Sequence, residues 1–398
     1  MLINRGFRFR LDPTPEQKVA FQQFSGVCRS IYNVALFQRE HFWRQYQSAT
    51  GYHLNYVAQC RELTTLRAEF DWIAAVAQQC QQQALHDLSV AFDRFFAGVS
   101  KFPRPRLKGV NESFRFQGRD ITIKRLNRGW SAARLPKIGW VRFRNTRPIR
   151  GKLKNATVSL DALGWHISFA CEISHEAQAS NLPAVGLDRG IENTIALSTG
   201  ELSSIPRMAI RALDKRHREA QRKAMRRRRG SKRRAKANRR AASIKAKAKR
   251  IRKHWNHTTT TALVRRFSVI CIEALNIRNM TASARGTANE PGRNVAQKSG
   301  TNRSILDQAW YDHACILEYK LAASGGTLIK VNPANTSRTC PICGSIDARN
   351  RESQAQFRCI ECGHEAHADV NAAINILRAG TRPSERAKVR CREPRIAA

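Results

Sequence analysis

The sequence is poor in acidic residues and lacks any long apolar run. It contains 30 Asp and Glu against 71 Lys and Arg in 398 residues, a formal net charge of +41. Self-repulsion on this scale requires a polyanion to offset it, and nucleic acid is the commonest one. No apolar run approaches the roughly 18 residues of a membrane span, which makes a bilayer the weaker candidate partner. Hydrophobic residues still make up 42% of the chain, which excludes a wholly disordered protein.

Cysteine is also sparse, but four cysteines are grouped. Eleven cysteines are too few for a disulfide scaffold, and residues 1–11 lack the continuous apolar stretch of a secretory signal. Two Cys-x-x-Cys pairs, Cys340/Cys343 and Cys359/Cys362, are separated by 15 residues. This spacing predicts a zinc ribbon with a structural Zn²⁺, because four thiolates leave no open coordination position for water. Two unrelated redox pairs are the alternative.

The first half of the chain predicts a β-domain interrupted by helices. Residues 7–11 alternate as in a strand, and residues 14–17 (TPEQ) have the composition of a helix start. The pattern is then helical to about residue 99. Short strands separated by Gly and Asn turns follow over residues 113–175 and predict a small antiparallel barrel.

Aromatic residues recur at helical spacing in the helical part. We interpret this stripe as core packing, with a platform for stacking nucleobases as the alternative. The stripe comprises Tyr32, Phe37, Phe42, Trp43, Tyr46, Phe70, Trp72, Phe92, Phe95 and Phe96.

The segment 211–253 is the most basic part of the chain. It contains 22 Lys and Arg against two acidic residues, a local net charge of +20 (22 − 2), about half of the total. Helix formers dominate except around Gly230, so we predict two long basic helices that bind a phosphate backbone. A disordered linker is the alternative. The predicted nucleic-acid contacts are Arg226, Arg227, Arg228, Arg229, Lys232, Arg233, Arg234, Arg239 and Arg240.

Three carboxylates stand at the ends of apolar elements. Asp188 closes the apolar run 184–187, Glu273 ends the run 268–272, and Asp369 opens a helix with an apolar face. An acid among apolar residues is costly to bury unless it is paired or binds a metal. Singly, each is a plausible cap or surface residue, but the two strand acids and one helix acid follow the order used by RNase H-like nucleases. Together they predict a site for two Mg²⁺ ions, which activate a water and stabilise the leaving oxygen of a phosphodiester.

On these motifs the chain resembles TnpB, the family of RNA-guided DNA endonucleases of insertion-sequence transposons, related to type V CRISPR effector nucleases. The similarity covers residues 184–378 well and extends more weakly upstream. Some relatives have Arg directly before the last acid, where this chain has Ala368, which makes a phosphate contact at that position doubtful. The segments that resemble the family are 185–191 (VGLDRGI), 272–276 (IEALN), 336–344 (TSRTCPICG), 357–363 (FRCIECG) and 367–373 (HADVNAA).

The resemblance implies an α+β multidomain fold, with Asp188, Glu273 and Asp369 as the catalytic acids and Mg²⁺ ligands. Residues 281–303, rich in Gly, Ser, Asn and Thr, predict a loop near the second acid, as a lid or a disordered stretch. The implied domains are a wedge-like β-barrel (1–12 and 100–178), a helical recognition domain (13–99), a RuvC-like, RNase H-like nuclease domain (183–335 and 364–378), the zinc ribbon (336–363) and a flexible basic tail (379–398).

The function that the resemblance implies is that of a transposon-encoded RNA-guided DNA endonuclease. It would bind a guide RNA and cleave complementary double-stranded DNA beside a short flanking motif, using two Mg²⁺ at a single RuvC-like site and one structural Zn²⁺. The alternatives are a cleavage-deficient RNA-guided repressor, which should lack one of the acids, a guide-independent transposase, and a basic zinc-ribbon RNA-binding protein. We expect a monomer on its RNA, with an oligomer as the alternative, no membrane partner, and a cytoplasmic, nucleoid-associated location of prokaryotic type.

Overall fold

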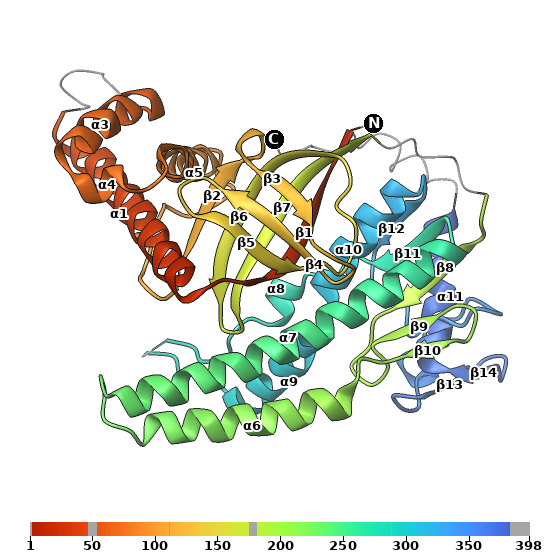
Figure 1. Ribbon diagram of the computed structural model, residues 1–398. Coiled ribbons are helices and arrows are strands. Elements are labelled where there is room, and N and C mark those ends of the chain that lie inside the picture. Colours follow the sequence, from red (N-terminus) through yellow and green to blue (C-terminus); the bar gives the residue numbers. More distant parts are fainter. Residues whose placement is uncertain (1, 47–53, 111, 175–180, 288, 383–398) are drawn as a thin grey trace. The chain divides into compact units, whose positions relative to one another are not determined.

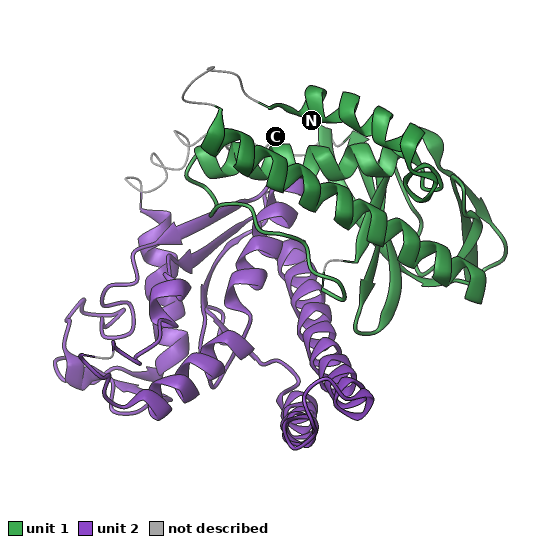
Figure 2. Cartoon of the chain, turned by 90° about the vertical axis from the view of Figure 1, so that its left-hand side faces the viewer, with its two compact units in different colours: residues 1–175 green, residues 176–398 purple. Residues whose placement is uncertain are grey.

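The chain forms two compact units, residues 1–175 and 176–398, each with its own sheet (Figures 1 and 2). No helix in the described parts has both the length and the apolar character that a membrane span requires. The predicted basic tail lies mostly outside the described residues, which end at residue 382. This computed structural model describes residues 2–46, 54–110, 112–174, 181–287 and 289–382.

Unit 1 is built on a seven-stranded antiparallel sheet with the strand order β2-β6-β7-β1-β5-β4-β3. The long first strand joins its two halves, because it pairs with β7 through residues 2–10 and with β5 only at Leu11 and Asp12. A barrel closes only when its first and last strands pair, and among the described residues the edge strands β2 and β3 do not. The predicted closed barrel is therefore wrong, and the sheet is open. The strands are β1 (Leu2–Asp12), β2 (Ser113–Gln117), β3 (Thr122–Arg125), β4 (Trp130–Leu135), β5 (Gly139–Arg144), β6 (Lys152–Asp161) and β7 (Gly164–Ser174).

The helices of unit 1 lie between β1 and β2 in the sequence. The predicted helix start is confirmed: the Thr14 hydroxyl accepts a hydrogen bond from the Gln17 main-chain N–H (3.3 Å), and the Gln17 side chain accepts one from the Thr14 N–H (3.1 Å). This capping box satisfies N–H groups that a helix terminus leaves without partners. The helices are α1 (Pro15–Gln45), α3 (Tyr56–Glu69), α4 (Asp71–Ala74) and α5 (Gln78–Phe96).

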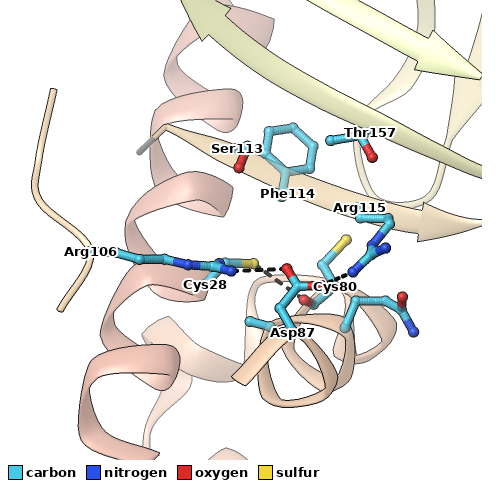
Figure 3. Close-up of a pocket in the computed structure, with 10 residues that line it drawn as sticks. Cys28, Cys80, Asp87, Arg106, Ser113, Phe114, Arg115 and Thr157 are labelled. Carbon is cyan, nitrogen blue, oxygen red and sulfur yellow. Dashed lines mark hydrogen bonds and ion pairs between the residues drawn. The ribbon is translucent and has the colours of Figure 1, made fainter. Parts of the chain in front are cut away.

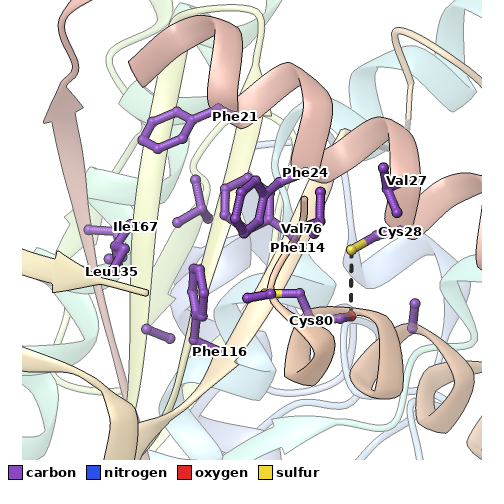
Figure 4. Packing of buried hydrophobic residues seen from close by; sticks show 14 of the residues in the cluster. Phe21, Phe24, Val27, Cys28, Val76, Cys80, Phe114, Phe116, Leu135 and Ile167 are labelled. Atoms are coloured by element: carbon purple, nitrogen blue, oxygen red, sulfur yellow. Dashed lines mark hydrogen bonds between the residues drawn. The ribbon is translucent and has the colours of Figure 1, made fainter. Parts of the chain in front are cut away.

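Aromatic rings from α1 and the sheet form the core of unit 1. Phe21 and Phe24 of α1 pack on Phe114 of β2 with ring centroids 5.7 and 5.2 Å apart (Figure 4). The predicted aromatic stripe belongs to this core only in part. Tyr32 and Phe92 are buried, and six members of the stripe are exposed, so the core interpretation is wrong for these six. They are Phe37, Trp43, Tyr46, Phe70, Trp72 and Phe96.

Unit 2 contains a mixed five-stranded sheet with the order β10-β9-β8-β11-β12. The strands β8, β11 and β12 are parallel, and β9 and β10 continue the sheet antiparallel to them. Alternate residues of β8 and β11 face opposite sides of the sheet. Leu187 and Ile272 pack with the helices α7 (Lys232–Arg266) and α10 (Trp310–Ala323), while Cys271 packs with α11 (Ala368–Thr381). The strands of unit 2 are β8 (Ala184–Asp188), β9 (Ile195–Leu197), β10 (Leu202–Ser203), β11 (Val269–Glu273), β12 (Thr327–Val331), β13 (Gln356–Arg358) and β14 (Glu365–His367).

The basic segment forms two helices, as predicted, that pack against each other through small residues such as Ala220 and Ala241. Gly230 lies in the connecting turn with φ +84°, a backbone conformation that favours glycine. The predicted loop over 281–303 is wrong in its second part, which forms α9. The helices of unit 2 are α6 (Arg207–Met225), α7 (Lys232–Arg266), α8 (Ile277–Met280), α9 (Val295–Asp307), α10 (Trp310–Ala323) and α11 (Ala368–Thr381).

Candidate functional site

The structure brings the three predicted acids together at one edge of the unit 2 sheet. The parallel register pairs Ile272 with Leu187, so the next residues of β11 and β8, Glu273 and Asp188, lie at the same level. Helix α11 crosses this sheet and places Asp369 in its first turn. The crossing depends on Gly186, because a Cβ at this position would lie 1.9 Å from the main-chain oxygen of Ala373.

Each carboxylate is oriented by a hydrogen bond from a neighbour. The Arg189 main-chain N–H donates to Asp188 Oδ1 (2.8 Å), and the Thr336 hydroxyl donates to Glu273 Oε1 (2.5 Å). Among the described residues no partner is recorded for Asp188 Oδ2 or Glu273 Oε2. One oxygen of each acid is therefore held, and the other remains open to a ligand.

The third acid is held on both sides. Asn193 donates to Asp369 Oδ2 (3.2 Å), and Arg351 forms an ion pair with Oδ1 (3.4 Å). The side chain of Asp369 is only 7% exposed. A buried carboxylate requires such compensation, since an unpaired charge away from water is costly.

The negative charges of Glu273 and Asp369 disfavour the ionisation of Asp188. Burial, reinforced by the negative charges of Glu273 and Asp369, raises the pKa of Asp188 from 3.8 to about 7. Burial also raises the pKa of Glu273, against the opposing effects of the Thr336 hydrogen bond and the charges of Arg189 and Arg351. Clustered acids of this kind are a common property of sites that bind cations or perform acid–base chemistry.

Sequence reasoning missed the residues that support the acids. Thr336 and Arg351 lie within or beside the cysteine ribbon, and Asn193 lies between β8 and β9. Arg189 donates from its guanidinium to the main-chain oxygen of Glu273 (2.5 Å) and so links the ends of two neighbouring strands. Arg189 directly follows Asp188 in the sequence, and this position could have identified it as a candidate site residue. The contact between Arg351 and Asp369 depends on tertiary structure and has no such signal in the sequence.

The four predicted cysteines form one cluster. Their sulfur atoms all lie within 4.8 Å of one another, with Cys340 3.6 Å from Cys362 and Cys343 3.5 Å from Cys359. Four sulfurs bound to a tetrahedral Zn²⁺ at about 2.3 Å would lie about 3.8 Å apart. The cluster therefore fits zinc binding and does not fit two independent redox pairs.

The two halves of the cluster repeat the same turn. The main-chain N–H groups of Gly344 and Gly363 donate to the oxygens of Cys340 and Cys359, both at 3.0 Å. Within the cluster, hydrogen bonding from the main-chain N–H of Cys362 lowers the pKa of Cys359 to about 7, whereas the pKa values of Cys343 and Cys362 are raised. His367, by contrast, caps α11 by accepting from the Asp369 N–H (3.2 Å), so it has a structural role.

The predicted nucleic-acid contacts lie at one end of the helix pair. Arg226 caps α6, Arg227 to Arg229 lie in the turn, and the remaining five belong to the first part of α7. All are exposed except Arg234, which is half-buried and donates to the main-chain oxygen of Arg227 (3.3 Å). Farther along α7, Arg252 pairs with Asp307 (2.7 Å) and anchors this helix to α9.

Three family models match successive parts of the chain. Residues 1–48 match a model described as "Helix-turn-helix domain", residues 168–284 match "Probable transposase", and residues 310–376 match "Cas12f1-like, TNB domain". Within the first match the described residues form strand β1 and the single helix α1, so this part contains no helix-turn-helix.

Two relatives match over nearly the whole chain. "Putative RNA-guided DNA endonuclease InsQ" of Escherichia coli (strain K12) is 37% identical over 94% of this chain and 92% of its own length. The chain belongs to the TnpB family. Another relative with RNA-guided DNA endonuclease in its name, from Streptomyces pristinaespiralis, is 31% identical over 95% of this chain and 90% of its own length. The family is therefore that of TnpB and Cas12f-like RNA-guided DNA endonucleases.

Solved structures show the same fold at low sequence identity. The protein of a Cas12f1–sgRNA–target DNA complex superposes with a TM-score of 0.61 at 14% identity, covering 96% of this chain and 99% of that one. The mini-RNA-guided endonuclease CRISPR-Cas_phi3 gives a TM-score of 0.50 at 11% identity, covering 95% of this chain and 92% of that one. The TnpB chain thus has a Cas12-like fold of mixed α/β content.

Proposed function

We propose that this TnpB protein cleaves double-stranded DNA chosen by pairing with a bound guide RNA, and that hydrolysis takes place at Asp188, Glu273 and Asp369. The observation that supports this most strongly is the meeting of the three acids from β8, β11 and α11, residues far apart in sequence. Burial, together with the charges of Glu273 and Asp369, raises the pKa of Asp188 to about 7, and a bound cation would offset the cost of ionising this carboxyl.

The donor set fits hard divalent cations. Asp188, Glu273 and Asp369 would hold two Mg²⁺ ions, whose chemistry is to activate a water and to stabilise the leaving oxygen of a phosphodiester. The chain's own groups prepare the site: the Arg189 N–H and the Thr336 hydroxyl each orient one carboxylate and leave its second oxygen free. Arg351 holds Asp369 and provides a positive charge beside the acids.

The proposal assigns a role to each part of the fold. Residues 1–12 and 100–178 would form the wedge-like part, now as an open sheet, with 13–99 as the recognition helices. Residues 183–335 and 364–378 would form a RuvC-like domain, which the parallel β8–β11–β12 core and the packing of α11 support. The ribbon 336–363 would bind one structural Zn²⁺, and the turn between α6 and α7 would bind guide RNA through phosphate neutralisation.

The test uses the RNA that co-purifies with the protein. After sequencing, a DNA duplex that matches the RNA and a scrambled duplex are incubated with the complex, with and without Mg²⁺. We expect cleavage only of the matching duplex, only with Mg²⁺, and only beside particular flanking sequences. Equal cleavage of the two duplexes would contradict guide dependence, and insertion of purified transposon ends without RNA would instead support the transposase alternative.

The cleavage-deficient repressor has less support. Loss of cleavage should remove at least one ligand of the acidic site, and all three carboxylates are present and oriented. Binding of the matching duplex without cleavage in Mg²⁺ would favour it.

A further inference from the structure

Unit 1, which contains none of the three acids, has a cavity lined by charged side chains. It has a volume of about 250 Å³ and lies among α1, α5, β2 and β6 (Figure 3). Its charged lining consists of Asp87 of α5, Arg115 of β2 and Arg106, which lies in the segment before β2. None of these residues takes part in the proposed cleavage.

Arg106 is fixed in position by its surroundings. Its main-chain N–H donates to Asn33 Oδ1 (2.7 Å), and Asn33 Nδ2 donates to its main-chain oxygen (3.0 Å). Its guanidinium lies over the ring of Tyr32, 4.0 Å from the centroid. A side chain held in this way loses little conformational entropy when it binds a ligand.

The charges in the cavity do not cancel. Asp87 pairs through one oxygen with Arg106 (2.9 Å) and through the other with Arg115. Two guanidinium groups against one carboxylate leave a net charge of +1. Each guanidinium has five N–H donors in a planar fork, and among the described residues no hydrogen bond other than that to Asp87 is recorded for either group.

The rest of the lining adds no competing negative charge. Cys28 is buried in the wall, and burial raises the pKa of its thiol to about 12, so the sulfur is neutral. Burial lowers the pKa of both Arg106 and Arg115, which means that both cations are short of solvation. An anion in the cavity would supply the missing interactions.

We propose that this cavity binds one phosphate group of a nucleic-acid backbone through Arg106 and Arg115, and that the carboxylate of Asp87, which pairs with both guanidinium groups, competes with the phosphate for them. The proposal rests on the proposed function, since it takes RNA or DNA as the source of the phosphate. Arginine suits this role because its planar fork matches phosphate oxygens.

The test compares three variants of the full-length protein: Arg115→Gln, Asp87→Asn and, as a control, Arg119→Gln. Arg119 lies outside the cavity, and its side chain is 81% exposed. Filter binding at several salt concentrations uses two labelled probes, the RNA that co-purifies with the parent protein and a DNA duplex of random sequence. Thermal melting of each variant is measured alongside.

The expected effects have opposite signs. Arg115→Gln should weaken binding about tenfold and should lower by about one the slope of log affinity against log salt concentration. Asp87→Asn should strengthen binding because it removes a negative charge beside the phosphate. Arg119→Gln should change affinity by less than about twofold. The probe for which the two cavity variants diverge identifies the strand that supplies the phosphate.

A purely structural role for the ion pairs predicts a different outcome. Both cavity variants would then lower the melting temperature and change affinity in the same direction, or not at all, for both probes, which would overturn the proposal. If the parent still cleaves guide-matched DNA in that case, the proposed function stands without the phosphate site. If the parent binds neither the RNA nor the DNA duplex, the proposed phosphate site and the proposed function are both wrong.

Discussion

The raised pKa of Asp188 leads to a prediction about stability that does not require cleavage to be measured. Asp188→Asn should stabilise the Mg²⁺-free protein at neutral pH and have little effect in acid. In the parent, folding raises the pKa of this carboxyl from 3.8 to about 7 because of burial and the charges of Glu273 and Asp369. A group whose folded pKa is raised contributes stability that is fully present below the unfolded pKa and is lost as the pH rises through the folded value.

The magnitude follows from the size of this difference. A pKa difference of about 3 corresponds to roughly 4 kcal/mol between about pH 4 and pH 8. For a unit of this size such a change moves Tm by on the order of 10 °C. The amide side chain of the Asp188→Asn variant cannot ionise. The Tm of the variant relative to that of the parent should therefore rise by this amount between about pH 4 and pH 8.

The assay is thermal melting of both proteins over this pH range, in buffer without Mg²⁺ and without chelator so that zinc is retained. Added Mg²⁺ should then stabilise the parent at neutral pH and stabilise Asp188→Asn much less, because the variant lacks one ligand. If the Tm of the variant and the Tm of the parent change in parallel with pH, the reasoning is refuted, since Asp188 would then ionise in the folded protein as it does in the unfolded chain.

Three further predictions concern other parts of the molecule. Cys340→Ser should lower zinc content and Tm together, because metal-binding energy in a ribbon is folding energy; elemental analysis should find one zinc per chain in the parent, and a folded parent without zinc would contradict the four-cysteine site. Thr336→Val should raise the Mg²⁺ concentration needed for half-maximal cleavage, because Glu273 loses an oriented hydrogen bond at little change in volume; an unchanged requirement would remove Thr336 from the site. Replacing the four arginines that connect α6 and α7 with Gln should weaken RNA retention and flatten its salt dependence in filter binding, whereas an unchanged slope would mark the turn as a solvated connection. That variant is Arg226→Gln, Arg227→Gln, Arg228→Gln and Arg229→Gln.

The features predicted correctly from sequence depend on local chemistry. The capping residues at 14–17 predicted where α1 begins, and Gly230 predicted the break between α6 and α7. The spacing of the two Cys-x-x-Cys pairs predicted a single cluster, because each pair can form its own turn before the two meet. The three acids could be singled out because each stands where an apolar element begins or ends, and in the structure Glu273 and Asp369 act electrostatically on Asp188. That these acids form the Mg²⁺ site stays a prediction.

The features that were missed depend on contacts between distant parts of the chain. Whether a sheet closes depends on its edge strands, and β2 and β3 do not pair although they are neighbours in sequence. The exposure of Phe37 and Trp43 depends on which helix packs against which face of α1. Arg351 could not be assigned to the acidic site from sequence, because only the folded ribbon brings it to Asp369.

Cleavage by the Asp188→Ala variant tests the central claim most directly. The parent and the variant are each loaded with the co-purifying RNA and given a matching DNA duplex in Mg²⁺, with duplex binding measured in parallel. The account predicts that the variant binds RNA and duplex nearly as well as the parent but does not cleave, because one ligand of the metal site is gone while the basic surfaces are intact. Substantial Mg²⁺-dependent cleavage by the variant would contradict the assignment of the acidic site.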